Sequence, residues 1–271
     1  MALTKTFFSA EETSLAEEFL SAGYVIRDVE DRAALDQLRH EIVIAAARAV
    51  NVPLPKDDGE FLDGVHKLIS IEKLNSFRLG LYRELNAQNW FRPTYFSLAR
   101  RIVEILVGNE LAMQNRINLS IQLPDDRTSL LDIHADVFGG ETPYQVVEWL
   151  PLVNVAQTKS MFILPRPQSE KVVADIKCYS GMPALFEAVK ANLVWLNIPY
   201  GKVLVFTPNV LHGNVVNEEQ TTRWSMNTRF TGLFTPYGSA EKTLGSYYLP
   251  ITARPTTRIG MTYRHPEGFE E

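Results

Sequence analysis

The amino-acid sequence predicts a mainly β protein with N-terminal helices, and its β part has the pattern of a sandwich or jelly roll. Three observations support this fold class. Apolar residues recur at helical spacing in the first hundred residues, and many short strand-like segments separated by Pro and Gly turns follow from about residue 116. Hydrophobic residues make up 45% of the 271-residue chain. The chain can therefore bury a sizeable core.

The helical part contains two strong candidates. Leu35, Leu38, Ile42 and Ala45 recur at helical spacing and predict a helix over about 30–50. Residues 51–59 (NVPLPKDDG) have turn chemistry that ends this helix in a loop. The second candidate begins near Pro93, since proline suits the first turn of a helix, and runs to about residue 108.

The period of the pattern then changes from helical to alternating. Residues 116–123 (RINLSIQL) alternate polar and apolar side chains before the turn cluster PDDRTS, which predicts a half-buried strand. A helical insertion over about 183–191 interrupts the later strands. Since no repeat or long linker is present, we expect a single domain over 1–271, with a helical covering region (1–110), a β core (111–235) and a C-terminal extension (236–271). The further strand candidates are 144–155, 160–164, 193–198, 202–206, 210–216 and 223–230.

Composition and charge disfavour several classes of protein. The net charge is −5, from 27 Lys plus Arg and 32 Asp plus Glu, and no block of like charge suggests a nucleic-acid groove or an anionic-membrane surface. The single cysteine, Cys178, cannot form an intramolecular disulfide or a cysteine-based zinc site, and we expect it to be inert. No apolar run approaches the roughly 18 residues of a membrane span, and residues 1–14 lack the apolar core of a signal peptide. We therefore expect a cytoplasmic protein with a small-molecule partner and leave its oligomeric state open.

Three side chains form a candidate metal site. His134 and Asp136 follow the 116–123 strand, and in an extended segment side chains two residues apart point to the same face. His212 comes directly after the apolar segment KVLVF and the turn TPN. Two histidines and one carboxylate are the facial triad that binds non-haem Fe(II) and leaves three coordination positions open. The alternatives are a surface turn for the first two residues and a structural core histidine for the third. A second His-x-Glu, at His265, is interpreted as chance.

A cationic side chain follows the triad. Arg223 lies eleven residues after His212, and Ser225 lies two residues further on the same face of a strand. A guanidinium fork with a nearby hydroxyl suits a buried carboxylate. Arg229 is the rival for this role because it lies six residues beyond Arg223 on the same face.

These motifs resemble the 2-oxoglutarate and Fe(II)-dependent oxygenases, within the phytanoyl-CoA dioxygenase-like branch. Residues 117–232 resemble a more specific group, the oxygenases encoded in sporadic bacterial carbohydrate clusters. The segments that carry this resemblance are NLSIQLP, VVEWLPLV, TKSMFILP, VLVFTPNVLHGN and TRWSMNTRF. This stretch is a little under half of the chain.

The resemblance implies a double-stranded β-helix (a cupin-like jelly roll) and an oxygenase that uses Fe(II), 2-oxoglutarate and O2. It implies that His134, Asp136 and His212 are the catalytic iron ligands, and that Arg223, Ser225 and Asn214 hold 2-oxoglutarate. Halogenating relatives have a small residue in place of the acid, so Asp136 favours hydroxylation or a related oxidation.

The resemblance also implies a polar, carbohydrate-derived substrate, with an acyl-CoA as the alternative. The helical region supplies aromatic and guanidinium groups suited to such a molecule, unless these residues only cover the barrel: Arg78, Tyr82, Arg83, Asn89, Trp90 and Arg92. Lys159, Asn118 and Gln122 either contact the cosubstrate or complete hydrogen bonding inside the barrel. Trp149, Phe162 and Trp195 are expected in the core.

Two other functions remain as alternatives. One is a cupin-like metal-dependent dioxygenase or isomerase that does without 2-oxoglutarate, against which Arg223 and Ser225 argue. The other is a non-catalytic jelly-roll module that binds a saccharide, for which no iron triad is needed.

Overall fold

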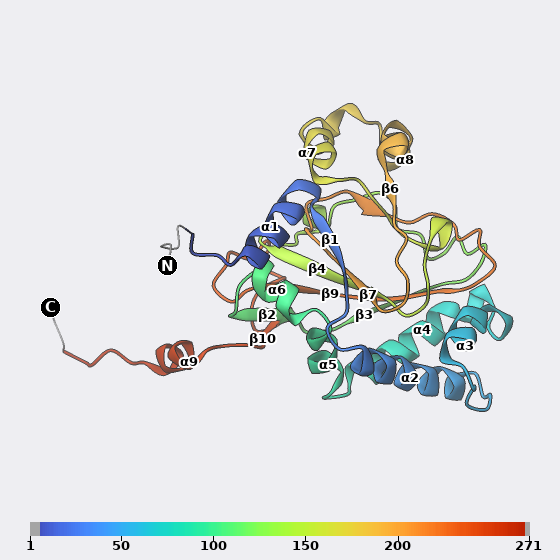
Figure 1. The fold of residues 1–271 in the computed structure, drawn as a ribbon, viewed down its shortest axis with the longest axis horizontal. Coiled ribbons are helices and arrows are strands. Elements are labelled where there is room, and N and C mark those ends of the chain that lie inside the picture. Colours follow the sequence, from blue (N-terminus) through green and yellow to red (C-terminus); the bar gives the residue numbers. More distant parts are fainter. Residues whose placement is uncertain (1–5, 269–271) are drawn as a thin grey trace.

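The computed structural model describes residues 6–268 and contains two antiparallel sheets with helices packed around them (Figure 1). The ends of the expected N-terminal stretch and C-terminal extension, residues 1–5 and 269–271, lie outside the described part. The larger sheet has the order β1 (Tyr24–Asp28), β7 (Lys202–Phe206), β4 (Gln145–Pro151), β9 (Arg223–Gly232), β2 (Leu111–Gln114) and β10 (Tyr248–Pro250), and β3 (Asn118–Gln122) also pairs with β9. The smaller sheet has the order β6 (Val194–Trp195), β5 (Phe162–Ile163) and β8 (His212–Gly213).

Strand β9 lies at the centre of the larger sheet, and its side chains alternate between two environments. One face packs against the helices: Trp224 Nε1 donates to the Leu62 carbonyl at 2.9 Å, and the Phe230 ring lies 5.5 Å from the ring of Phe96. The other face presents a row of polar side chains to a cavity: Arg223, Ser225, Asn227 and Arg229.

In the described part of the chain, six α-helices precede β2: α1 (Ala10–Ala22), α2 (Arg32–Ala49), α3 (Asp58–Gly64), α4 (Ile71–Asn86), α5 (Phe91–Ser97) and α6 (Arg100–Leu106). The helix predicted over 30–50 is confirmed as α2, and its N-cap Asp31 accepts a hydrogen bond from the Ala34 amide at 2.9 Å. In Figure 1, α2 to α5 lie together on one side of the sheets, and α7 (Arg166–Ala174) and α8 (Met182–Val189) lie on the other.

The single helix predicted over 93–108 is wrong, because α5 ends and α6 begins within it. The break has a tertiary cause. The Glu30 amide donates to the Leu98 carbonyl at 2.9 Å, and the Glu30 carboxylate accepts from the Arg101 amide at 2.6 Å. A residue from before α2 therefore satisfies groups that a continuous helix would have bonded internally.

The strand predictions are confirmed in position but not in number or length. β3, β4, β7 and β9 fall on predicted segments, whereas β5, β6 and β8 are two-residue strands within longer predicted ranges. Strands β1, β2 and β10 and helix α7 were not predicted, so the helical insertion is longer than 183–191. Residues in α-helices outnumber strand residues in the described part of the chain, so the phrase "mainly β" describes the core and not the content.

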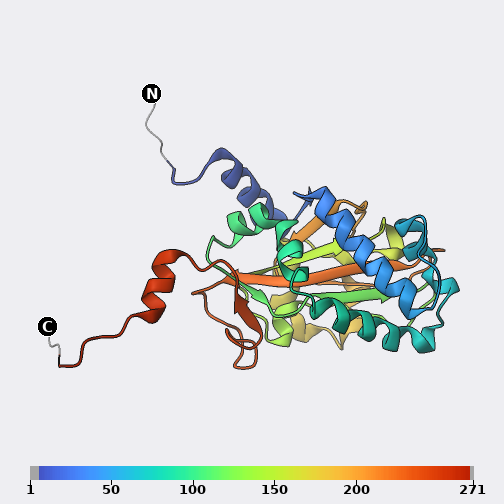
Figure 2. The same ribbon diagram turned by 90° about the horizontal axis from the view of Figure 1, so that it is seen from below.

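The end of the chain extends away from the body. Helix α9 (Pro255–Thr262) has no buried residue and projects outward in both ribbon views (Figure 2). Among residues 6–268, no helix combines the length and the apolar content needed to cross a bilayer.

Candidate metal centre

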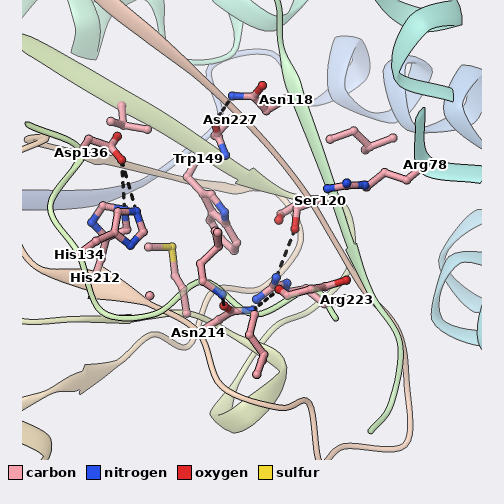
Figure 3. Close-up of a pocket in the computed structure, with 18 of the residues that line it drawn as sticks. Arg78, Asn118, Ser120, His134, Asp136, Trp149, His212, Asn214, Arg223 and Asn227 are labelled. Atoms are coloured by element: carbon pink, nitrogen blue, oxygen red, sulfur yellow. Dashed lines mark hydrogen bonds and ion pairs between the residues drawn. The ribbon is translucent and has the colours of Figure 1, made fainter. Parts of the chain in front are cut away.

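A cavity of about 590 Å³ lies between the polar face of the larger sheet, strand β8 and helix α4, and its volume suits a small molecule. Figure 3 shows that polar groups lie at both ends of the cavity. His134, Asp136 and His212 point toward one another at one end, and Arg223 lies apart from them beside Ser120.

The two histidines are held side by side by their own backbones. The His134 amide donates to the His212 carbonyl and the His212 amide donates to the His134 carbonyl, each at 2.9 Å. This reciprocal pair places the ring centroids 4.5 Å apart. In the described structure the extended segment expected at His134 forms a single bridge to β8 and no regular strand.

Asp136 reaches the histidines from a short turn and not from a strand. It is the first residue of a 3₁₀ helix, Asp136–Gly139, which corrects the extended geometry expected for His-x-Asp. Its Oδ1 still lies 3.6 Å from His134 Nε2 and 3.7 Å from His212 Nε2. Donor atoms of the three side chains all lie within 4.8 Å of one another, so these residues can hold a metal ion.

Arg229 fixes the orientation of the Asp136 carboxylate. Its Nη2 and Nε donate to Asp136 Oδ2 at 2.6 and 3.1 Å, while Oδ1 faces the histidines. The carboxylate of Glu141 is also close, with its Oε1 3.5 Å from Arg229 Nε. The sequence placed Arg229 as a rival to Arg223, but here it is already neutralised by carboxylates.

The surroundings favour the metal-binding protonation states of His212 and Asp136, whereas those of His134 favour its protonated ring. Burial lowers the pKa of His212 to about 4, so its ring is neutral at pH 7. Burial opposes ionisation of Asp136, but the hydrogen bond with His134 and the charge of Arg229 hold the pKa of Asp136 well below its ordinary value. Burial also works against a charged His134, yet contact with Asp136 and the Asp132 carbonyl raises its pKa.

The other end of the cavity contains a buried cation with unused hydrogen-bonding capacity. Arg223 is 4% exposed, and burial lowers the pKa of its guanidinium to about 10, opposed by the charge of Asp126. Its Nη2 donates to Ser120 Oγ at 3.2 Å, but its Nε has no partner among the described residues, nor does the buried hydroxyl of Ser225. Buried polar atoms without partners are rare, and here two of them line one cavity. The pair can bind a carboxylate.

Asn214 lines the cavity but uses its amide to hold a neighbouring segment. Its Oδ1 accepts from the Leu131 amide at 2.6 Å, and its Nδ2 donates to the Ser129 carbonyl at 3.1 Å. Gly213 permits this close approach, since a Cβ there would lie 2.7 Å from the Leu131 carbonyl oxygen. Residues 128–131 therefore form one wall of the cavity.

The remaining sequence candidates divide between the cavity and other places. Asn118 and Trp149 line the cavity, whereas Lys159 pairs with Asp63 at 2.6 Å outside it. Gln122 donates to the Val215 carbonyl at 2.7 Å and does not line it. Phe162 is in the core as expected, but the prediction for Trp195 is wrong, because that residue is 36% exposed at the end of the small sheet.

Two of the six N-terminal candidates reach the cavity, Arg78 and Tyr82. The other four, Arg83, Asn89, Trp90 and Arg92, do not line it. Arg92 instead donates to the Met113 carbonyl at 3.2 Å.

Several lining residues were missed by sequence reasoning. Ser120 and Asn227 lie on the paired strands β3 and β9, where Ser120 is opposite Ser225 and Asn118 is opposite Asn227. The available signal was the alternation itself, since polar residues recur at every second position of both strands. The wall at 128–131 carries no comparable signal.

Comparisons with known proteins support this fold. No protein-family model and no curated protein matches the sequence. Among the solved structures that are similar in fold are those of ThoJ, EctD and AviO1. The nickel complex of the non-heme monooxygenase ThoJ is 18% identical, covering 94% of this chain and 89% of its own, with a TM-score of 0.57. EctD from S. alaskensis, solved with 2-oxoglutarate and 5-hydroxyectoine, is 15% identical. The match covers 88% of this chain and 80% of EctD, with a TM-score of 0.54.

The third structure is AviO1 from Streptomyces viridochromogenes Tue57. It is 14% identical, covering 86% of this chain and 100% of its own, with a TM-score of 0.53. At these identities the likeness establishes a shared fold.

Proposed function

We propose that the protein is a non-haem Fe(II) and 2-oxoglutarate-dependent oxygenase, and that residues 1–271 form one oxygenase domain with a double-stranded β-helix core. One observation carries the proposal. A single cavity contains a His-Asp-His cluster at one end and, apart from it, a buried guanidinium and hydroxyl with unused hydrogen-bonding capacity. The shared fold with ThoJ, a non-heme monooxygenase, and EctD, solved with 2-oxoglutarate, supports the same assignment.

The residues at the first end fit Fe(II). His134, His212 and Asp136 supply two imidazoles and one carboxylate, the donor set of the facial triad. Bound there, Fe(II) supplies dioxygen activation, in which one oxygen atom enters the substrate and the other enters succinate as 2-oxoglutarate loses carbon dioxide. Arg229 keeps Asp136 Oδ2 occupied, so Oδ1 is the oxygen left for the metal.

The residues at the second end fit the distal carboxylate of 2-oxoglutarate. Arg223 Nε and Ser225 Oγ would donate to it, and this would satisfy both unpaired atoms. Asn214 then acts indirectly, by holding the wall at 128–131 against the cavity. Burial of this end excludes water from the ion pair and strengthens it.

This pairing of sites favours the proposal over its alternatives. A cupin-like enzyme without 2-oxoglutarate has no use for a buried arginine with a free Nε at this place. A saccharide-binding module has no use for the cluster of metal donors. The retained Asp136 favours oxidation without halogenation.

We propose a polar, carbohydrate-derived substrate, as in the sporadic carbohydrate-cluster oxygenases of the phytanoyl-CoA dioxygenase-like branch. Arg78 and Tyr82 in the cavity wall support a polar molecule with a ring. The cavity of about 590 Å³ suits a small molecule better than a long acyl chain.

The experiment is a succinate assay with Fe(II), 2-oxoglutarate and two substrate panels, nucleotide-linked sugars and acyl-CoAs. We expect sugar-stimulated succinate formation that is absent in His212→Ala. Stimulation by acyl-CoAs alone would overturn the carbohydrate proposal and leave the oxygenase assignment intact. Metal-dependent oxidation without 2-oxoglutarate consumption would favour the cupin-like alternative.

A further inference from the structure

We propose that Arg78 and Tyr82 of α4 form an anion-binding subsite for the substrate, which would therefore carry a carboxylate or a phosphoryl group. The proposal rests on the proposed function, because it assigns the metal end and Arg223 to the cofactor and cosubstrate. Figure 3 shows the Arg78 side chain reaching into the cavity on the side away from His134 and His212.

The position of Arg78 follows from the geometry of α4. Leu74, Leu81 and Leu85 of this helix are buried and anchor it. Arg78 and Tyr82 lie one turn apart on another face, both half-buried, and both line the cavity. The helix thus presents a cation and an aromatic ring together to the space where a substrate would bind.

The charge of Arg78 is not balanced by any acid in the described chain. Its one hydrogen bond is from Nη2 to the neutral amide oxygen of Asn75, at 2.8 Å, and no carboxylate of residues 6–268 lies within ion-pair distance. Asp136 is the only acid among the cavity-lining residues, and it is engaged by Arg229 at the opposite end.

The chemistry of the pair defines the ligand class. A guanidinium offers a planar fork of donors that matches a carboxylate or a phosphoryl group. The Tyr82 ring supplies an apolar face on which a sugar or other ring can pack, and its hydroxyl makes no hydrogen bond with the described residues. The subsite therefore fits an acidic small molecule better than a neutral one.

One rival use of Arg78 exists within the same cavity. Figure 3 shows its guanidinium directed toward Ser120, whose Oγ accepts from Arg223. Arg78 would then add to the cosubstrate site and not to a substrate site. Replacing Arg78 would weaken the binding of the substrate anion under the first use and the binding of 2-oxoglutarate under the second.

The test titrates simple anions into protein already loaded with Ni(II) and 2-oxoglutarate, by calorimetry at low ionic strength. Sulfate stands in for a phosphoryl group and acetate for a carboxylate. The variants are Arg78→Gln and the control Arg83→Gln, which changes an exposed arginine of the same helix outside the cavity. Thermal unfolding and 2-oxoglutarate affinity are measured for each protein.

We expect the wild type and Arg83→Gln to bind at least one of the two anions with a Kd on the order of 10 mM or tighter, and Arg78→Gln to bind it about 10-fold or more weakly, as for loss of one charged hydrogen-bonding partner. The preferred anion identifies the acidic group. The affinity for 2-oxoglutarate should not change.

Equal anion binding by Arg78→Gln and wild type, or no anion binding by wild type, would overturn the subsite. So would weakened 2-oxoglutarate binding in Arg78→Gln with unchanged anion binding. Failure of the wild type to bind 2-oxoglutarate would instead count against the proposed function, and the anion titration would still report on Arg78.

Discussion

The two site histidines are oriented by hydrogen bonds from the nitrogen that faces away from the cluster. Nδ1 of His134 lies 2.7 Å from the Asp132 carbonyl, and Nδ1 of His212 lies 3.0 Å from the Val210 carbonyl. A proton on each Nδ1 leaves the lone pair on Nε2, which faces Asp136. The backbone therefore selects the tautomer that can bind a metal.

This arrangement predicts that each histidine is required for metal binding. His134→Ala and His212→Ala should each weaken Ni(II) or Fe(II) binding by more than the roughly 10- to 100-fold that loss of a supporting group causes, because a direct ligand is removed. The measurement is calorimetric titration with Ni(II). His40→Ala is the control, since His40 pairs with Asp58 outside the cavity. Wild-type metal affinity in both site variants would contradict the assignment.

Replacing Arg223 should weaken the binding of 2-oxoglutarate, whereas replacing Arg229 should weaken the binding of the metal. Arg223→Ala should raise the Kd for 2-oxoglutarate by about two orders of magnitude or more, since removing one partner of a buried ion pair costs roughly 3 to 5 kcal/mol. Its metal affinity should be preserved. Arg229→Lys keeps the charge but loses the fork on Asp136, so it should weaken the metal by about 10- to 100-fold.

Both affinities are measured by titration of each variant, first with Ni(II) and then with 2-oxoglutarate. A large loss of 2-oxoglutarate binding in Arg229→Lys, with intact metal binding and little effect of Arg223→Ala, would reverse the two roles.

At the residue scale, sequence spacing identified the candidate donors but not their supports. His134, Asp136, His212 and Arg223 could be selected because their types and intervals match a chemical task. The role of Arg229 depends on Asp136 lying beside it, and that contact joins residues 93 positions apart. Local pattern carries no information on such a contact.

At the scale of elements, strand β4 is unusual in being buried along all seven residues. Val147 and Trp149 line the cavity, and Glu148 between them faces the helices. Glu148 is fully buried, and neither carboxylate oxygen has a hydrogen-bond partner among the described residues. Burial, with the nearby charge of Glu30, raises the pKa of Glu148 well above its ordinary value.

Glu148 therefore predicts a pH-dependent cost to folding. Because its pKa is raised in the folded state, the folded protein retains a proton that the unfolded chain releases above about pH 4.5, and stability falls as pH rises from there. Glu148→Gln should increase the free energy of unfolding at pH 8, because glutamine carries no buried charge there, and should have little effect at pH 4. Urea unfolding at both pH values measures this.

The matched control is Glu141→Gln. Glu141 accepts hydrogen bonds from Lys242, Tyr247 and Tyr248. These contacts and the charge of Arg229 lower the pKa of Glu141, although burial opposes them. Its replacement should destabilise the protein at pH 8. If Glu148→Gln were also destabilising at pH 8, an unseen partner would have to satisfy Glu148.

Helices and strands were predicted correctly where apolar residues recur on one face of the segment. β3 and β9 alternate clearly and were found, and α2 has a continuous apolar stripe. Strands β1 (YVIRD), β2 (LAMQ) and β10 (YLP) begin with consecutive apolar residues, so they show no polar–apolar alternation to recognise. The break between α5 and α6 could not be predicted, because it depends on Glu30 reaching across from another segment.

At the scale of the molecule, the cavity is built from parts of the chain that are far apart in sequence. Arg78 comes from α4, His134 and Asp136 from the middle of the chain, and Arg223 from β9. The resemblance implied which of them would meet at the metal, but composition and periodicity could not. From the sequence, Arg78 and Tyr82 of α4 were only two of six N-terminal candidates for the substrate pocket, and nothing in the pattern distinguished them from the other four.

This construction predicts that ligands stabilise the whole fold. In the proposed site, metal and 2-oxoglutarate would contact several elements at once, and a ligand at 100 times its Kd stabilises the native state by about 2.7 kcal/mol. For a protein of this size that corresponds to a rise in Tm of about 5 °C or more. Scanning calorimetry should show one rise with Ni(II) and a further rise with 2-oxoglutarate. His212→Ala should lose both rises, and Arg223→Ala only the second.

The most direct test of the proposed oxygenase site is an anaerobic titration of 2-oxoglutarate into the Fe(II)-loaded protein, followed by calorimetry. We expect one 2-oxoglutarate per iron-loaded chain, with much weaker binding to metal-free protein and to Arg223→Ala, because the molecule has to bridge the metal and the arginine. Equal affinity with and without metal, or no binding to the iron-loaded wild type, would contradict it.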